Sequence, residues 1–403
     1  MKDYYTERQR EMKIQAVHLN PDLIGSELRS YDLNNEAIEL FKRQAFRHLI
    51  KLRHIPEPAV SFLEKEAAAH NLIILIHKKE QDITGSNDVI LAGTTSEFAG
   101  ICTSLEKQME DPFLIGQMIR GVLEKLNKNK PDNLLLGKTV LPLGKRTLLM
   151  GILNITPDSF SDGGRFDQLE KALMQAHKMA EDGADIIDIG GESTRPGHKQ
   201  VSAEEELKRV LPVIKALKND HTFKLPLSID TCKAAVAKAA LQAGVEMLND
   251  IWGLKADSAL ARVAAGFKVP ICLMHNRHST DYEDLIPDII AEMEESIELA
   301  LRAGIEDKQI IIDPGIGFGK DLQQNLDVML HLRDFCSLGY PLLLGTSRKS
   351  MIGKTLDLPV EERLEGTAAT VAYGISAGAE IIRVHDILEM RRVAVMTDAM
   401  VRR

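Results

Sequence analysis

Polar side chains recur at one kind of position in this sequence, directly after short apolar runs rich in Ile, Leu and Val. Asp230, Asn249 and Asp313 each end such a run and offer carboxylate or amide groups. Because buried polar groups need hydrogen-bond partners, this set suits a flat heterocycle with several N–H donors. The pattern therefore indicates a pocket for a donor-rich ring.

Cationic side chains occupy equivalent places near the ends of other runs. They are Arg195, Lys349, Arg383 and His385. Their N–H donors suit phosphate or carboxylate groups, so the expected ligand has a donor-rich ring and an anionic tail. His and carboxylate residues are not clustered at metal spacing, which argues against a metal cage. A single Mg²⁺ held by Asn154 and diphosphate oxygens fits, since magnesium binds through few protein ligands.

These residues belong to a repeating pattern that begins near residue 140. Short apolar runs alternate eight times with segments of helical apolar spacing, such as 168–182 and 203–218. Runs without polar alternation are typical of strands buried on both faces. The expected strands are 148–156, 185–190, 225–230, 246–250, 270–275, 310–313, 341–345 and 380–384.

Eight βα units in about 265 residues match a (β/α)8 TIM barrel, for which roughly 250 residues is typical. A doubly wound open sheet has the same local rhythm, but eight units are many for it, and the first βα turn lacks GxGxxG. We therefore expect an α/β fold with the barrel at residues 139–403. Catalytic groups in such barrels come from the C-terminal strand ends, so the polar residues should converge on one rim.

Residues 1–138 follow a different pattern. They predict a smaller α/β or α+β domain. Its expected elements are helical stretches at 37–52 and 58–70, apolar runs at 72–77 and 88–92, and an amphipathic segment at 112–126. A largely polar connector with Pro and Gly then places the boundary near residue 138. The extension offers no catalytic constellation, and we expect a structural role in preference to an oligomerisation or regulatory module or the remnant of a fused enzyme.

Composition excludes several classes of protein. The 403 residues include 50 Lys and Arg against 59 Asp and Glu, and the net charge of −9 disfavours a nucleic-acid binder. The four cysteines form no CxxC pair, which excludes zinc-finger and disulfide-scaffold proteins. A signal-peptide pattern and an apolar run of about 18 residues are both lacking, so we expect a cytoplasmic protein without a membrane span.

Seven motifs closely resemble the dihydropteroate synthase family. In order they are MGILNITPDSFSDGG, IDIGGESTRPG, SIDT, LND, DPGIGFGK, GTSRKS and RVHD, and the resemblance covers residues 140–403. It implies that 4-aminobenzoate displaces diphosphate from (7,8-dihydropterin-6-yl)methyl diphosphate, giving 7,8-dihydropteroate for folate biosynthesis. It also implies Mg²⁺ as cofactor, a homodimer, and competition by sulfonamides at the aminobenzoate pocket.

The resemblance carries roles over to the matching positions. Pterin binding is implied for Asp230, Asn249, Asp313 and Lys349. Diphosphate binding is implied for Thr194, Arg383 and His385, with Asn154 holding Mg²⁺. The aminobenzoate pocket is implied to include Phe160, Arg195, Pro196 and Ser350. The residues expected to act on the reacting groups are Asp230, Lys349, Arg383 and His385.

The implied reaction makes modest chemical demands. Diphosphate is a good leaving group, so the enzyme need only neutralise its developing charge and orient the nucleophile. An electron-rich dihydropterin can share positive charge at its methylene, which favours a dissociative displacement with Asp230 stabilising the cation. The aminobenzoate amine is neutral at pH 7, so no general base is needed. The loops around 162–164 and 195–197 are expected to close over the site and exclude water.

Three other functions are compatible with parts of the pattern. A methyltetrahydrofolate–corrinoid methyltransferase has a similar barrel and pterin site but needs no diphosphate clamp, so residues 347–350 and 383–385 favour the synthase. A non-catalytic pterin-binding protein would have lost motif residues, yet every matched one is present. A sugar-phosphate isomerase leaves the acceptor set Asp230, Asn249 and Asp313 unexplained. An assay of diphosphate release separates the synthase from a pterin-binding protein.

Overall fold

The computed structural model describes residue 36 and residues 48–78, 86–126, 128, 130–156, 165–192 and 201–402. The chain divides into two compact units, Met1–Glu124 and Lys125–Arg403. This division lies upstream of the boundary near residue 138 that the polar connector suggested. No helix in the described ranges combines the length and the apolar character that a bilayer span requires.

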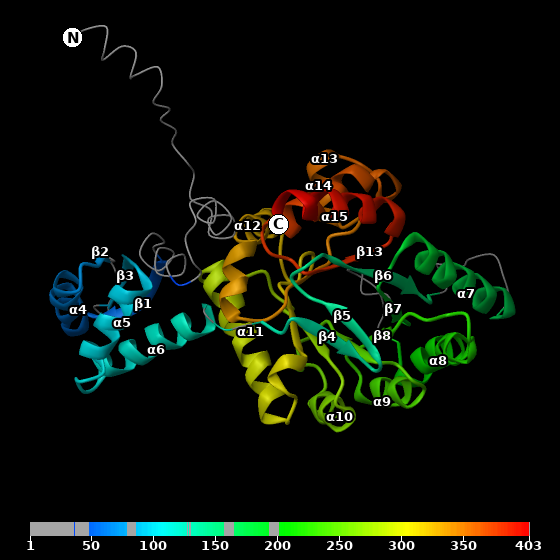
Figure 1. The fold of residues 1–403 in the computed structure, drawn as a ribbon, viewed down its shortest axis with the longest axis horizontal. Coiled ribbons are helices and arrows are strands. Elements are labelled where there is room, and N and C mark those ends of the chain that lie inside the picture. Colours follow the sequence, from blue (N-terminus) through cyan, green and yellow to red (C-terminus); the bar gives the residue numbers. More distant parts are fainter. Residues whose placement is uncertain are drawn as a thin grey trace, which may run out of the picture. The chain divides into compact units, whose positions relative to one another are not determined.

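The N-terminal unit is an antiparallel sheet with helices, the smaller α+β domain expected from the sequence (Figure 1). Its strands, in spatial order, are β1 (His48–Pro56), β3 (Ser86–Gly93) and β2 (Ile73–Lys78). Its helices are α4 (Glu57–Ala69), α5 (Thr95–Leu105) and α6 (Asp111–Leu126). Apolar residues of the sheet and all three helices form one buried cluster, so the unit has its own core.

One expectation for this unit is wrong. The helical stretch expected at 37–52 does not extend to its end, because residues 48–52 belong to β1. Ile50 and Leu52 are buried while Leu49 and Lys51 are exposed, which is the two-residue alternation of a strand. Pairing with β3 decides the local structure here, and the sequence pattern alone does not reveal that pairing.

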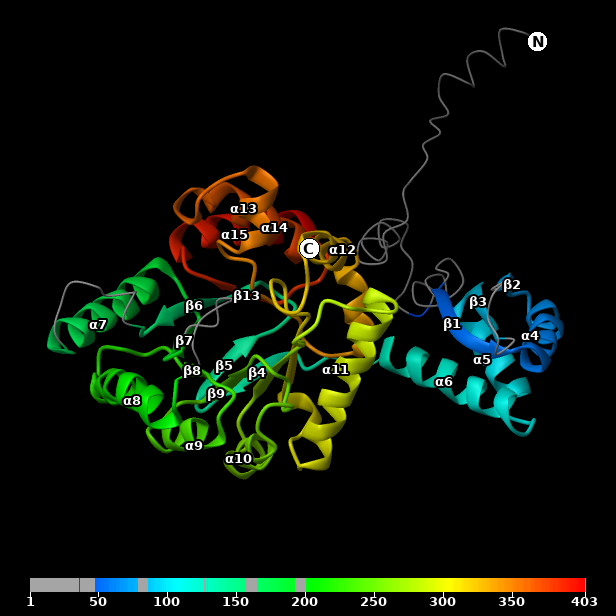
Figure 2. The same cartoon turned by 180° about the vertical axis from the view of Figure 1, so that it is seen from behind.

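The second unit confirms the expected barrel. Eight parallel strands are ordered β11-β10-β9-β8-β7-β6-β13-β12, and a parallel bridge between Ile312 and Leu342 joins the two ends. Figures 1 and 2 show this unit from opposite sides. The strands are β6 (Leu148–Asn154), β7 (Ile186–Gly190), β8 (Leu227–Asp230), β9 (Met247–Asp250), β10 (Ile271–Met274), β11 (Ile310–Asp313), β12 (Leu343–Leu344) and β13 (Ile381–Val384). Each coincides with an expected run to within a few residues.

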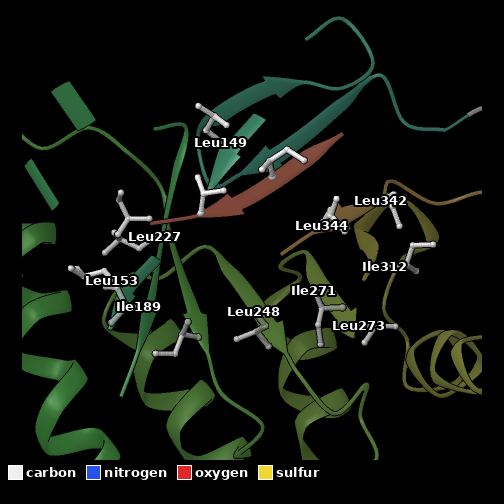
Figure 3. Packing of buried hydrophobic residues seen from close by; sticks show 14 of the residues in the cluster. Leu149, Leu153, Ile189, Leu227, Leu248, Ile271, Leu273, Ile312, Leu342 and Leu344 are labelled. Atoms are coloured by element: carbon white, nitrogen blue, oxygen red, sulfur yellow. The ribbon is translucent and has the colours of Figure 1, made fainter. Parts of the chain in front are cut away.

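Helices follow the strands and cover the outside of the barrel. They are α7 (Arg165–Asp182), α8 (Ala203–Asn219), α9 (Ala234–Gln242), α10 (Ala259–Phe267), α11 (Leu285–Arg302), α12 (Leu322–Leu330), α13 (Ser350–Leu356), α14 (Leu364–Ser376) and α15 (Ile387–Val401). Outward-facing strand residues such as Leu149, Ile189 and Leu248 pack in the cluster between sheet and helices (Figure 3). Successive strand residues alternate in direction, so their neighbours point into the barrel.

A hairpin packs against the inward-facing apolar residues of the barrel strands. It consists of β4 (Asn133–Leu136) and β5 (Thr139–Pro142), joined by a turn in which Gly137 has φ +57°. Leu134 and Leu136 are buried with inward-facing strand residues such as Met150 and Met247. The connector expected to be a polar linker is therefore partly structural, and the barrel unit includes the chain from Lys125 onward.

Candidate active site

A cavity of about 530 Å³ lies at the C-terminal side of the barrel strands. Its lining includes the ends of β6 and β13, the turn after β11 and the segment between β12 and α13. The expected site residues that line it are Asn154, Lys349, Ser350, Arg383 and His385. This is the rim on which barrel enzymes carry their catalytic groups.

Arg383 connects the lining of this cavity to two buried carboxylates. Its Nε donates to Oδ2 of Asp188 at 2.7 Å, and its Nη2 donates to Oδ2 of Asp230 at 2.7 Å. The amide of Asn249 donates to the same oxygen of Asp188 at 2.9 Å. Four inward-facing side chains from four strands thus form one network, and charge-assisted bonds of this kind are the stronger ones in proteins.

The network leaves acceptors unused. Among the described residues, Oδ1 of Asp188, Oδ1 of Asp230 and Oγ of Ser228 are buried without a hydrogen-bond partner. Ser228 lies directly beside Asp188 in the paired strands β7 and β8. Buried polar atoms are normally satisfied, so these oxygens mark a place where a ligand or an ordered water supplies donors. A donor-rich ring is the kind of ligand that the sequence suggested.

Burial shifts the pKa values of these groups. It raises the pKa of Asp230 to about 7, although the Arg383 guanidinium opposes that shift. It also raises the pKa of Asp313, against the neighbouring Lys349 ammonium, and lowers the pKa of Lys349 to about 8. Burial thus opposes the charged form of all three groups, and pKa values perturbed in this way are common at functional sites.

Asp313 and Lys349 each form a hydrogen bond with the turn that follows β11. Oδ1 of Asp313 accepts a hydrogen bond from the backbone N–H of Gly315 at 2.7 Å. The ammonium of Lys349 donates to the carbonyl of Ile316 and lies 4.6 Å from the centre of the Phe318 ring. Asp313 is thus held at the strand end, and Lys349 is held against the turn that forms part of the cavity wall.

His385 is oriented by Ser347. The hydroxyl of Ser347 accepts from the backbone N–H of His385 at 3.2 Å and lies 3.0 Å from its Nδ1. In the Nε2–H tautomer of the imidazole the hydroxyl donates to Nδ1, and in the Nδ1–H tautomer it accepts from that nitrogen. Arg348, between these elements, forms a two-point ion pair with Asp386 at 2.9 and 2.5 Å. The segments that carry Lys349 and His385 are therefore joined.

Four of the expected site residues lie outside the described residues: Phe160, Thr194, Arg195 and Pro196. The stem of the second loop is described, and ion pairs hold it. Lys233 pairs with Glu192 and, at 2.6 Å, with the buried Glu206, while Glu192 accepts from the backbone N–H of Val201 at 3.2 Å. The two ends of the segment that carries Arg195 are thus tied together.

Asp188 is the site residue that sequence reasoning missed. It is fully buried, and it contacts both Arg383 and Asn249. A signal was present, because a carboxylate inside the apolar run IIDIG has no structural reason to be there without a polar partner. It lies two residues before the end of its strand, whereas Asp230 and Asp313 are the last residues of theirs.

Asp188→Asn should weaken pterin binding by roughly tenfold or more, because Arg383 and Asn249 lose the charge that orients them. Calorimetric titration with a pterin ligand measures this change. Asp185→Asn is the matched control, since Asp185 pairs with Arg146 at 2.6 Å at the other end of the same strand. Equal losses of affinity in both variants would show that Asp188 acts only through stability.

Comparison with known proteins identifies the family. The family model for pterin-binding enzymes matches residues 150–385. The dihydropteroate synthase of Clostridium beijerinckii is 56% identical over 269 residues, which cover 66% of this chain and 99% of that protein. The synthase of Bacillus subtilis is 55% identical over 262 residues, covering 65% of this chain and 91% of the relative.

The chain belongs to the dihydropteroate synthase family. It is therefore a transferase of that family, and the resemblance drawn from its motifs is confirmed. Solved synthases agree: the Clostridium difficile enzyme, crystallised with pteroic acid, is 52% identical with a TM-score of 0.63, and covers 65% of this chain and 99% of its own. The Xanthomonas albilineans enzyme with 4-aminobenzoic acid is 39% identical, with a TM-score of 0.63 and coverages of 67% and 98%. These relatives leave about a third of the chain unmatched.

Proposed function

We propose that this chain condenses (7,8-dihydropterin-6-yl)methyl diphosphate with 4-aminobenzoate, giving 7,8-dihydropteroate and diphosphate in folate biosynthesis. The observation that supports this most strongly is the Asp188–Arg383–Asp230 network. It combines unpartnered buried acceptors with a guanidinium that lines the cavity. Acceptors for a donor-rich ring and a cation for a diphosphate thus stand side by side.

The pterin ring is assigned to the buried end of the site. Oδ1 of Asp230 is the acceptor best suited to ring N–H donors, because its other oxygen is engaged by Arg383. Asn249 adds a mixed amide, and Asp313 with Lys349 completes the set of polar groups. A clostridial synthase of the same family was crystallised in the presence of pteroic acid, which supports a pterin as the ligand.

The diphosphate is assigned to Arg383, His385 and Thr194. Arg383 has five N–H donors, of which the two bonds to Asp188 and Asp230 use two. His385 lines the same cavity, and in its Nε2–H tautomer, with Ser347 donating to Nδ1, the ring proton is on Nε2. Both groups can donate to phosphate oxygens as the leaving group gains charge.

The donor set at Asn154 fits Mg²⁺ bound together with the diphosphate. Asn154 offers one amide oxygen in the cavity that Arg383 and His385 also line. Within the described residues no group of three His, Cys, Asp or Glu side chains is arranged to hold a metal. Magnesium commonly binds through substrate phosphates and one or two protein oxygens, and it would supply charge neutralisation there.

The aminobenzoate is assigned to Ser350, which lines the cavity, together with Phe160, Arg195 and Pro196. The related Xanthomonas synthase was crystallised with 4-aminobenzoic acid, which supports this compound as a ligand. The reaction needs orientation of a neutral amine and stabilisation of charge, so Asp230 stabilises the cationic pterin methylene and Arg383 the departing diphosphate. We assign no general base.

Diphosphate release from the full chain tests this function. Release should require the dihydropterin diphosphate, Mg²⁺ and 4-aminobenzoate together, and omission of any one should reduce it to background. Release that is independent of 4-aminobenzoate would mean hydrolysis of the diphosphate. Binding of pterin without any release would support a pterin-binding protein instead.

We also propose that the barrel unit is the catalytic domain and that it forms a homodimer. A chain of residues 125–403 should keep activity, because it retains the whole unit and its hairpin. A chain of residues 139–403 lacks β4, whose Leu134 and Leu136 are buried against the barrel interior, and should lose about 2–5 kcal/mol of unfolding free energy. Denaturant unfolding measures the stability of the two truncated chains, and light scattering measures whether they form dimers. Equal stability of the two truncations would contradict the role given to the hairpin.

A further inference from the structure

The turn at residues 314–320 is packed unusually tightly against the connection that follows β10. Gly315, Gly317 and Gly319 all have positive φ, at +72°, +83° and +55°. A Cβ added at Gly315 would lie 1.9 Å from the carbonyl oxygen of His275, and one at Gly319 would lie 2.6 Å from that of Arg277. Backbone contacts this close require glycine and leave the turn little room to move.

Lys320 holds the turn from inside. Its ammonium lies 3.0 Å from the carbonyl oxygens of Gly315 and Phe318 and 2.9 Å from Nδ1 of His275. The side chain is nearly buried, and its three N–H donors match these three acceptors. Two of the acceptors belong to the turn, so the ammonium fixes the path of the backbone between them.

His275 connects Lys320 to Glu292 through its two ring nitrogens. An ammonium cannot accept a hydrogen bond, so Nδ1 of His275 is the acceptor and its ring proton is on Nε2. That proton points to Oε2 of Glu292 at 3.1 Å, and Arg277 lies 3.5 Å from the other carboxylate oxygen. Burial and the Lys320 charge lower the pKa of His275 to about 2, so its ring stays neutral.

We propose that Lys320 is a positioning residue, which with His275 and Glu292 keeps the turn closed so that Phe318 and Lys349 hold their places in the cavity wall. Gly317 and Phe318 line the cavity, and Lys349 donates to the turn at Ile316 from the opposite side. The effect on catalysis rests on the proposed function, whereas the effect on the turn does not.

The arrangement makes the turn sensitive to pH. Burial lowers the pKa of Lys320 to about 7, and a neutral amine has two donors for three acceptors. The charged groups that face it are Asp313 from β11, Glu292 from α11, Arg277 after β10 and Lys349 before α13, and the hydroxyl of Tyr282 donates to Gly319 with its pKa raised to about 12. Of these, the two carboxylates favour the ammonium and the two cations oppose it.

Removing the charge of Glu292 tests whether this carboxylate stabilises the ammonium of Lys320. Glu292→Gln keeps an acceptor for His275 but removes a negative charge that stabilises the ammonium, so the alkaline fall in kcat/KM should move to lower pH by roughly 0.5–1 unit. Glu295→Gln is the matched control on the same helix, since Glu295 is exposed and pairs with Lys255. Glu292 is not among the groups that shift the pKa of Lys349. An unmoved profile, or equal movement in the control, overturns the proposal.

Hydrogen exchange tests the turn without turnover. In Lys320→Met the backbone N–H groups of Gly315, Gly317 and Phe318 should exchange at least tenfold faster, while the exposed Lys308→Met serves as control. In the intact turn they donate to Asp313, Asn325 and Gly315 respectively. Unchanged protection in a folded Lys320→Met variant refutes the positioning role. If Lys320→Met does not fold, exchange of the same N–H groups is compared between Glu292→Gln and the wild type at pH 6 and at pH 8. The turn of the variant should open at lower pH than that of the wild type, and equal protection of both proteins at both pH values would overturn the proposal. A chain that makes no dihydropteroate yet shows these exchange changes would contradict the proposed function and leave the role of Lys320 standing.

Discussion

Arg383→Ala should lower kcat/KM by about 10²–10³-fold, the range seen when one preorganised donor to a developing negative charge is removed. Arg383 is expected to act on the leaving diphosphate and also neutralises Asp188 and Asp230, each at 2.7 Å. The variant leaves two buried carboxylates without their cation, which costs about 3–5 kcal/mol of unfolding free energy. Steady-state kinetics and denaturant unfolding measure the two effects separately.

Arg146→Ala is the control for this loss. Arg146 also makes a two-point pair with a carboxylate, that of Asp185, at 2.8 and 2.6 Å. Asp185 directly precedes β7, at the end of this strand opposite to the site. Its side chain is 46% exposed, so its loss should change stability by less than about 1 kcal/mol and leave kcat/KM unchanged. If Arg383→Ala kept the wild-type kcat/KM, Arg383 would have no role in the reaction.

Asp230→Asn should raise the KM or Kd for the pterin substrate by about 10²-fold, while the KM for 4-aminobenzoate stays near its wild-type value. The carboxylate offers Oδ1 to the ring and Oδ2 to Arg383, whereas an amide offers one oxygen and turns an N–H donor toward another donor. The change weakens pterin recognition and therefore appears in that substrate's binding, and loss of the charge beside the cationic methylene should lower kcat as well.

The pH dependence of pterin binding gives the same residue a second test. The ionised carboxylate is the acceptor, and burial raises the pKa of Asp230 to about 7. Wild-type affinity should therefore be highest above pH 7 and fall by up to tenfold per unit as pH drops below it. Asp230→Asn should lack this acidic limb. An acidic limb of the same midpoint in the variant would assign the titration to another group.

The sequence predicted the barrel well because strands buried on both faces appear as uninterrupted apolar runs. It predicted Asp230, Asn249 and Asp313 as candidates because each directly ends such a run. It missed Asp188, whose importance depends on Arg383, a residue 195 positions further along the chain. A contact over that separation depends on closure of the barrel, which local spacing does not express.

Other parts of the chain also depend on partners that are distant in sequence. Residues 48–52 form a strand because they pair with β3, and the polar connector contains a hairpin whose leucines pack against the inward-facing residues of the barrel. The Lys320–His275–Glu292 chain joins the turn after β11 to the connection after β10 and to α11, and it was not predicted. In each case a partner distant in sequence decides the role of a locally ordinary residue.

Product analysis tests the central claim most directly. The full chain is incubated with dihydropterin diphosphate, Mg²⁺ and 4-aminobenzoate, and both products are quantified, dihydropteroate by mass spectrometry and diphosphate enzymatically. Our account predicts one dihydropteroate for each diphosphate released, with both lost together in Arg383→Ala. Diphosphate released without dihydropteroate, or no product from a folded wild-type chain, would contradict it.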